Sequence, residues 1–143
     1  MHATLNTVSD LEPFIAAYCA ANLCRPSSEM QNEIYTRLAD TPIVVIQVGL
    51  PIAWVASHEW RDQQTLEAFV APEWRRRGLV KLGAHMLLAA GHLVKTEPIS
   101  VFSSDCVPLA KSLGFPQVDH YTRHGRDWVL YLGQSNAVIP AAG

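Results

Sequence analysis

The chain has 143 residues, of which 49% are hydrophobic and 17% are charged, and its formal net charge is −2. This length fits one domain with one core, and the composition is ordinary for a globular protein. The weak net charge argues against attraction to nucleic acid or anionic membranes, and three cysteines (Cys19, Cys24 and Cys106) are too few for a disulfide framework.

Two helices are predicted in the first 42 residues. Ser9 and Asp10 form an N-cap before an amphipathic stretch that continues to about Leu23. The Pro26–Ser28 segment ends this helix and caps a second one, which Pro42 ends. The sequence contains neither a run of ~20 apolar residues nor a basic leader followed by an apolar run, so we expect a cytoplasmic protein without membrane contact.

Three strands are predicted next, at residues 43–48, 52–57 and 65–70, because apolar and β-branched residues dominate there. Gly49–Pro51 joins the first two strands as a short hairpin connection. The polar stretch His58–Gln64 is interpreted as a loop that leads into the third strand.

A long helix is predicted to begin near Arg76 and to end before Pro98. Apolar residues recur along it at helical spacing, which indicates one buried face. These residues are Leu79, Leu82/Gly83, Met86/Leu87, Ala90 and Leu93/Val94.

The C-terminal third is predicted to hold a short buried strand at 99–103 and a short helix at 106–113, ended by a left-handed Gly114. Two final strands, at about 117–123 and 128–132, form a hairpin. We therefore predict a single domain over residues 1–133 and a loose C-terminal tail at 134–143.

This order of elements contains one strand–helix–strand unit, which implies one parallel strand pair with antiparallel pairs around it. We therefore expect an α/β (α+β) fold, in which helices cover both faces of a mixed sheet.

One segment, Phe69–Val80, carries the clearest chemical signal. A strand ends there, and a helix begins after three consecutive arginines and Gly78. Unpaired N–H groups and the dipole of a helix N-terminus favour an anion such as a diphosphate, which a glycine lets approach closely. Positive charge opposes the same dipole, so the arginines are better explained by a bound anion than by solvation alone.

The same segment resembles motif A of the GNAT acyltransferase superfamily, whose usual form is a strand, Val-x-Pro-Glu-aromatic-Arg-x-x-Gly-x-Gly/Ala, and a helix. The matching residues are Val70, Pro72, Glu73, Trp74, Arg75 and Gly78. The later Leu113-Gly114-Phe115 is similar to the Leu-Gly-Phe that closes the penultimate helix of the family. The order of elements agrees with the family over nearly the whole chain.

The resemblance implies a twisted mixed sheet of about six or seven strands, with acetyl-CoA between two splayed parallel strands at 66–70 and 99–103. It implies that backbone N–H groups of 76–80 hold the pyrophosphate and that the acyl carbonyl bonds to the backbone of the strand at 67–70. The expected acetyl-CoA-binding residues are Phe69, Val70, Arg75, Arg76, Arg77, Gly78, Leu79 and Val80.

The implied reaction is direct transfer of the acetyl group to a primary amine, and Glu67 is the first candidate for its general base. A solvent-facing Glu67 is the alternative, with Glu59 and His58 as second choices. For protonation of the leaving thiolate we name Ser104, while Cys106 and Tyr121 stay open.

Two positions depart from the pattern of the family. Val80 stands where glycine or alanine is usual, and its side chain either crowds the pyrophosphate or points into the core. Ser103 and Ala110 stand where the family often has an asparagine and the tyrosine that acts as general acid. These departures keep a second hypothesis open: a GNAT-shaped structural or binding protein without activity, with a short similarity at 120–126 to internal virion proteins of short-tailed phages.

The sequence also bears on metal ions and on other binding partners. The pairs His85/His92 and His120/His124 lack the cysteines or carboxylates of a metal site, so no metal is expected. The acceptor is an amine on a small molecule or a protein, nucleic acid is not expected, and a homodimer stays open.

Overall fold

The computed structural model describes residues 1–7, 15–16, 32, 41–94, 96–101, 107–123 and 126–134. The two predicted N-terminal helices fall almost wholly outside these residues; Ile15, Ala16 and Asn32 are helical. Seven strands form one sheet in the order β1-β2-β3-β4-β5-β7-β6. The strands are β1 (His2–Thr7), β2 (Pro42–Val48), β3 (Leu50–Trp60), β4 (Gln63–Val70), β5 (Pro98–Val101), β6 (Gln117–Arg123) and β7 (Arg126–Gln134).

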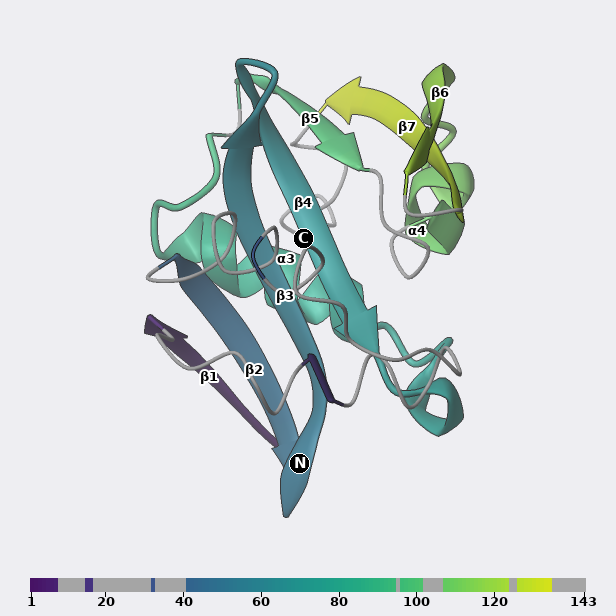
Figure 1. Cartoon of the computed structure of the whole chain (residues 1–143). Coiled ribbons are helices and arrows are strands. Elements are labelled where there is room, and N and C mark those ends of the chain that lie inside the picture. Colours follow the sequence, from purple (N-terminus) through teal and green to yellow (C-terminus); the bar gives the residue numbers. More distant parts are fainter. Residues whose placement is uncertain are drawn as a thin grey trace.

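Only β4 and β5 pair in parallel; every other neighbouring pair of the described strands is antiparallel. The helix α3 (Leu79–Ala89) connects β4 to β5 across one face of the sheet, and α4 (Val107–Ser112) lies beside β6 and β7 (Figure 1). The predicted mixed sheet with one parallel pair is therefore confirmed. Strand β1, at one edge, is the strand that the sequence reading missed.

Alternation along the strands divides the sheet into two faces. On the face covered by α3, which we call the α3 face, Val55, Leu66 and Ala68 belong to one hydrophobic cluster with the buried side of the helix. Gly83 makes this contact close: a Cβ atom there would lie 2.5 Å from a methyl carbon of Val55. The side chains on the opposite face include Thr65 and Glu67, which are also buried.

The helix α3 is shorter than predicted at both ends. It begins at Leu79 rather than near Arg76, and it ends at Ala89 rather than before Pro98. Gly91, at φ +84°, ends it: the N–H of Gly91 donates to the carbonyl of Leu88, and the next N–H donates to that of Leu87. These two hydrogen bonds, together with the left-handed glycine, form the Schellman motif.

The shorter helix also corrects the predicted apolar stripe. Leu79, Gly83 and Leu87 are buried as expected, whereas Leu82 is 36% exposed and Ala90 lies beyond the helix on the surface. A periodic pattern cannot show where a helix ends, because a left-handed glycine can close it at any turn.

The predicted loop over residues 58–64 is wrong. Strands β3 and β4 extend through these residues and turn at Arg61 and Asp62, both with positive φ, at +51° and +60°. Two left-handed residues suit the type I′ hairpin, which matches the twist of the strands. Polar residues hid this hairpin because its outer positions are exposed and its inner ones carry polar side chains.

The Leu-Gly-Phe sequence has a clear structural role. Gly114 is left-handed at φ +74°, and the N–H of Phe115 donates to the carbonyl of Ala110, so the predicted glycine stop is confirmed. The Phe115 ring is buried against β7, where a Cβ on Gly133 would lie 2.2 Å from it. Strand β7 includes Gln134, which we had assigned to the tail; residues 135–143 lie outside the described part of the chain.

Candidate acyl-CoA site

The site lies at the end of β4, past the described part of its pairing with β5. The pairing of β4 with β5 covers Gln64–Leu66 opposite Ile99–Val101, and β4 then continues to Val70. Figure 1 shows the two strands starting together and diverging toward the end of β4. This is the geometry expected for the splayed pair.

Strand β4 leads into a compact connection to α3. A single 3-10 turn, η1 (Pro72–Trp74), follows the strand; just before it, the N–H of Ala71 still donates to the Ile52 carbonyl of β3 at 2.8 Å. Arg76 then adopts a left-handed backbone at φ +62°, and Gly78 does so at φ +74°. A left-handed non-glycine residue costs about 1–2 kcal/mol and is enriched at functional sites.

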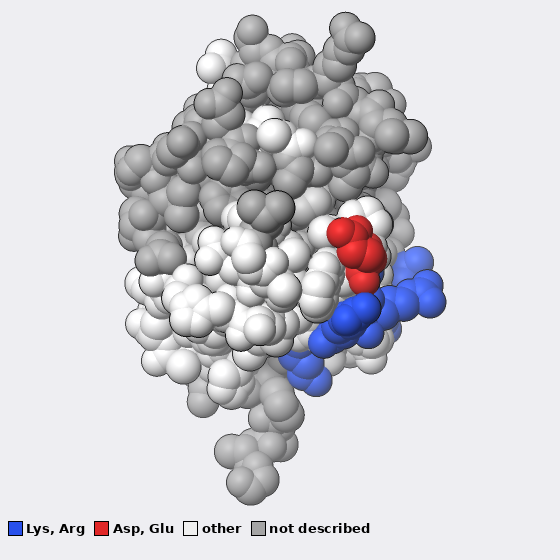
Figure 2. Space-filling view, turned by 90° about the horizontal axis from the view of Figure 1, so that it is seen from below, with Lys and Arg blue, Asp and Glu red and all other residues white. Residues whose placement is uncertain are grey.

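The three arginines precede the helix and differ in their contacts. The Nε of Arg75 donates to the Val70 carbonyl at 3.1 Å, which ties the connection to the end of β4. Arg77 lies over the Trp74 ring, 4.6 Å from its centre, and donates to the carbonyl of Glu73 at 3.2 Å. All three side chains are exposed, and Figure 2 shows Lys and Arg side chains gathered on this end of the molecule.

The start of α3 is open to an anion. Gly78 is the N-cap, no side-chain hydrogen bond caps the helix, and no acidic residue lies in its first turn. A Cβ built on Gly78 would meet nothing within 4 Å among the atoms of the described residues. Both properties fit the phosphate groups of CoA, which need donors and close approach to the backbone.

Val80 points away from this space. Its side chain is only 8% exposed and belongs to the hydrophobic core, as the second of our two interpretations holds. Its backbone N–H, with those of Leu79 and Lys81, lies in the first helical turn. The departure from the usual small residue is therefore a core substitution.

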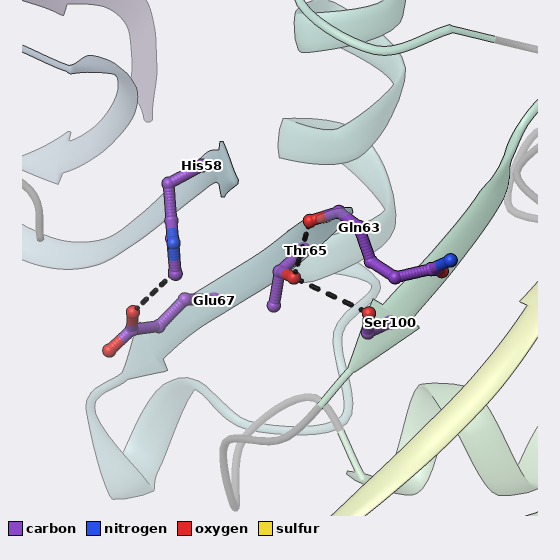
Figure 3. Close-up of polar contacts among 5 residues, drawn as sticks. All are labelled: His58, Gln63, Thr65, Glu67 and Ser100. Carbon is purple, nitrogen blue, oxygen red and sulfur yellow. Dashed lines mark hydrogen bonds and ion pairs between the residues drawn. The ribbon is translucent and has the colours of Figure 1, made fainter. Parts of the chain in front are cut away.

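The predicted base, Glu67, is buried on the opposite face of the sheet and bonded to His58. The His58 Nε2 lies 3.0 Å from Oε2 of Glu67, and the two side chains are 5% and 7% exposed (Figure 3). The alternative of a solvent-facing Glu67 is wrong. Hydrogen bonding to the imidazole and burial together hold the carboxylate in one place.

A second polar pair on the same face was missed by the sequence reading. Thr65 Oγ1 donates to the carbonyl of Gln63 at 3.1 Å and lies 3.4 Å from Ser100 Oγ, on the neighbouring parallel strand (Figure 3). Both residues are at most 1% exposed. The signal that could have shown this face is the alternation of polar residues at 63, 65 and 67.

The other predicted catalytic residues are placed differently. Glu59 is on β3 rather than in a loop; it is exposed and, as the neighbour of His58, lies on the face away from Glu67. Ser104 and Cys106 lie outside the described residues. Ala110 is fully buried in the core. As an alanine, it offers no proton donor at the position where the family often has a tyrosine.

Two further findings concern other kinds of site. Within the described ranges, no group of three or more His, Cys, Asp and Glu side chains could hold a metal ion. In the same part of the chain, no helix is long and apolar enough to span a bilayer; α3 has 11 residues.

Comparison with known proteins places the fold. No protein-family model matches the sequence, and no curated protein matches it. Solved structures do: a putative acetyltransferase, yncA, from Salmonella typhimurium, with its cofactor acetyl-CoA, is 17% identical with a TM-score of 0.61, covering 93% of this chain and 94% of that one.

Two further structures agree over similar lengths. A GNAT superfamily phosphinothricin acetyltransferase from Sinorhizobium meliloti, in complex with acetyl-CoA, is 18% identical with a TM-score of 0.59, covering 94% of this chain and 89% of that one. A ribosomal-protein-alanine N-acetyltransferase from Brucella melitensis is 16% identical with a TM-score of 0.62, covering 94% and 99%. The similarity expected from motif A is thus confirmed at the level of structure, and the chain has the fold of the GNAT acetyltransferases.

Proposed function

We propose that the protein is an N-acetyltransferase that moves an acetyl group from acetyl-CoA to a primary amine. The observation that carries this proposal is the connection between β4 and α3, with its uncapped helix start, left-handed Gly78 and exposed arginines. It follows directly on a strand that diverges from its parallel partner. The acetyl-CoA complexes of two proteins with this fold add support.

Acetyl-CoA would bind in the order that the elements follow. Backbone N–H groups of residues 76–80 would hold the pyrophosphate, and the guanidinium groups of Arg75–Arg77 would add charge-assisted contacts, each worth about 1.5–3 kcal/mol. The acetyl group would lie along β4 at Phe69 and Val70, beyond the paired part of the strands. Arg75 would act partly through its bond to Val70, since that bond links the phosphate end to the acyl end.

Glu67 would act as the general base. Its carboxylate would take a proton from the acceptor ammonium, and the freed amine nitrogen would attack the thioester carbonyl carbon. A C–N bond forms, the C–S bond breaks, the new amide nitrogen loses its surplus proton to solvent, and CoA leaves as a thiolate. Proton removal by a positioned base contributes about 10²–10⁴ in rate.

The thiolate would be protonated without a tyrosine on α4, because Ala110 occupies the place where the family often has one. A CoA thiolate is a good leaving group, so solvent or Ser104 can supply this proton. The acceptor would be an amine on a small molecule or a protein; one neighbour in fold is named for a ribosomal-protein alanine.

The buried Ala110 also favours a second candidate, a GNAT-fold protein that binds CoA without transferring the acetyl group. The two functions differ in one measurement. Purified protein is incubated with acetyl-CoA and one acceptor at a time: spermidine, free amino acids, or a peptide beginning with alanine. The thiol of the released CoA is measured with a colorimetric reagent.

Amine-dependent release of CoA, with the acetylated amine detected by mass, would support the transferase. Binding of acetyl-CoA without transfer to any amine would support the second candidate. An acetyl-CoA hydrolysis rate measured without amine serves as the control in each case.

A further inference from the structure

The pair His58–Glu67 joins two strands across the sheet face opposite α3. In the register of β3 and β4, His58 lies opposite Thr65 and Glu67 lies opposite Ala56, so the two side chains are diagonal neighbours on one face. Diagonal residues are within reach of long side chains. The contact is 3.0 Å between Nε2 and Oε2 (Figure 3).

The role of a general base decides which atom donates in this contact. Such a base is ionised, and an ionised carboxylate only accepts hydrogen bonds, so in this role Nε2 of His58 carries the proton that it donates to Glu67. Both side chains are more than nine-tenths buried. A buried carboxylate is costly unless it is hydrogen-bonded, so the imidazole stabilises the ionised form of Glu67 that a general base requires.

The described surroundings of the pair carry no further charge. On the same face, the described side chains of β2 to β5 that lie nearest in register are apolar or carry a hydroxyl or amide group; they are Ile43, Val45, Trp54, Ala56, Gln63, Thr65, Phe69 and Ser100. No other titratable side chain of the described residues lies among them. Among the described residues, the pair is therefore the charged group that this stretch of the face offers to an incoming ammonium.

We propose that His58 is a positioning residue for Glu67: its Nε2–H bond fixes the rotation of the carboxylate and keeps it ionised for proton removal from the acceptor. This inference rests on the proposed transferase function. It makes His58 and Glu67 one functional unit, so the loss of either should weaken the same step. A pair that is merely structural would affect stability without that dependence.

Two substitutions of His58 keep a polar amide but place its N–H group at different distances from Glu67. His58→Gln places an amide N–H near the position of Nε2, whereas His58→Asn carries the same amide one carbon shorter, near the position of Nδ1. Both variants are made in the wild type and in Glu67→Gln, and their melting temperatures and acetyl-CoA dissociation constants are measured first. Turnover is then followed with the amine that gives the highest rate in the panel above.

The expected result is a kcat for His58→Asn about 10- to 100-fold below wild type, with His58→Gln within about threefold and acetyl-CoA affinity unchanged in both. In the Glu67→Gln background, His58→Asn should cost less than threefold further, because the group that it positions is already gone. Equal losses in Gln and Asn, or a full additional loss in Glu67→Gln, would overturn the proposal.

A measurement without turnover protects the test against unfolding of His58→Asn. In protein labelled with ¹⁵N-histidine, a slowly exchanging imidazole N–H signal of His58 should be present in wild type and lost or weakened in Glu67→Gln. Its absence in wild type would overturn the inference while leaving the transferase proposal intact. Acetyl-CoA binding without transfer in wild type would instead overturn the transferase proposal and the role of His58 with it.

Discussion

The two faces of the sheet use the same strands for different ends. Toward α3, β3 and β4 present Val55, Leu66 and Ala68, and the helix packs on them so closely that Gly83 has no room for a methyl group. Toward the opposite face, the same strands bury His58 and Glu67 as a hydrogen-bonded pair. Apolar burial stabilises a fold without conditions, whereas a buried carboxylate costs free energy unless partners compensate.

The two faces therefore differ in role: the α3 face stabilises the fold, and the opposite face holds the residues proposed for the chemistry. Substitutions on the α3 face should change the free energy of unfolding and leave the reaction alone. Substitutions on the opposite face should change the reaction first. Substitution of Gly78, at the start of α3, should affect the binding of acetyl-CoA more than substitutions on either face.

The largest effect is expected for Glu67→Gln, which keeps the size of the side chain and removes its basicity. Turnover should fall about 100- to 10,000-fold, since a general base contributes that much, while acetyl-CoA affinity stays within twofold. Steady-state kinetics and calorimetry measure the two quantities. Glu59→Gln is the comparison, because Glu59 is exposed on the other side of β3; a loss there as large as that at Glu67 would contradict the assignment.

The α3 face should respond in stability. Leu87 is fully buried, so Leu87→Ala should lower the free energy of unfolding by about 2–5 kcal/mol. Leu82, 36% exposed on the same helix, is the matched control, and its alanine variant should lose less than about 1 kcal/mol. Urea denaturation provides both values; similar losses in the two variants would show that the face is not packed as described.

Gly78→Ala should separate binding from folding at the connection. Gly78 and Gly114 share a φ of +74° and open space around the built Cβ, so alanine should cost each about 1–2 kcal/mol of stability. Only Gly78→Ala should weaken acetyl-CoA binding, by about tenfold, as expected for the loss of one charge-assisted hydrogen bond to phosphate. Equal affinities in the two variants would remove the pyrophosphate from this turn.

The smallest effect is expected at an exposed ion pair between Arg61, in the β3–β4 turn, and Asp119 on β6. The Nη1 of Arg61 donates to Oδ2 of Asp119 at 2.6 Å. The hydrogen bond from Arg61, followed by that from the backbone N–H of His120, holds the pKa of Asp119 below its ordinary value of 3.8. Because the folded-state pKa is lowered, the stabilisation is present above the ordinary value and is lost as pH falls through the lowered one.

Melting temperatures of wild type and Asp119→Asn should therefore differ slightly at neutral pH and converge in acid. Salt should reduce the difference at neutral pH, because both side chains are exposed. A difference that persists below the ordinary pKa would assign the effect to something other than the charge of Asp119.

Much of the fold could be predicted from the sequence, because local signals agree with it. Strand β2 contains the apolar run Ile43–Ile46, and Gly114 ends α4 through a left-handed backbone that its neighbours would resist. The prediction failed where a local pattern has two solutions. Residues 58–64 are as polar as a loop, yet their inner side chains face buried space across a tight hairpin.

The candidate site divides in the same way. The turn that we propose to bind the pyrophosphate could be seen in the sequence because its residues are consecutive, from Arg75 to Val80. The contact of His58 with Glu67 was not, since it depends on the register of two strands that the sequence does not fix. The burial of Val80 fits its place beside the apolar stripe and decides between the two interpretations, whereas the inward Ala110 shows that a family position can be filled by core packing.

Binding of acetyl-CoA by the turn between β4 and α3 can be measured by isothermal titration of acetyl-CoA into the purified wild-type protein, with Gly78→Ala and Gly114→Ala titrated under the same conditions. We expect saturable one-to-one binding in wild type and in Gly114→Ala, and clearly weaker binding in Gly78→Ala. No saturable binding in wild type at millimolar acetyl-CoA, or equal binding in all three proteins, would contradict binding at this turn.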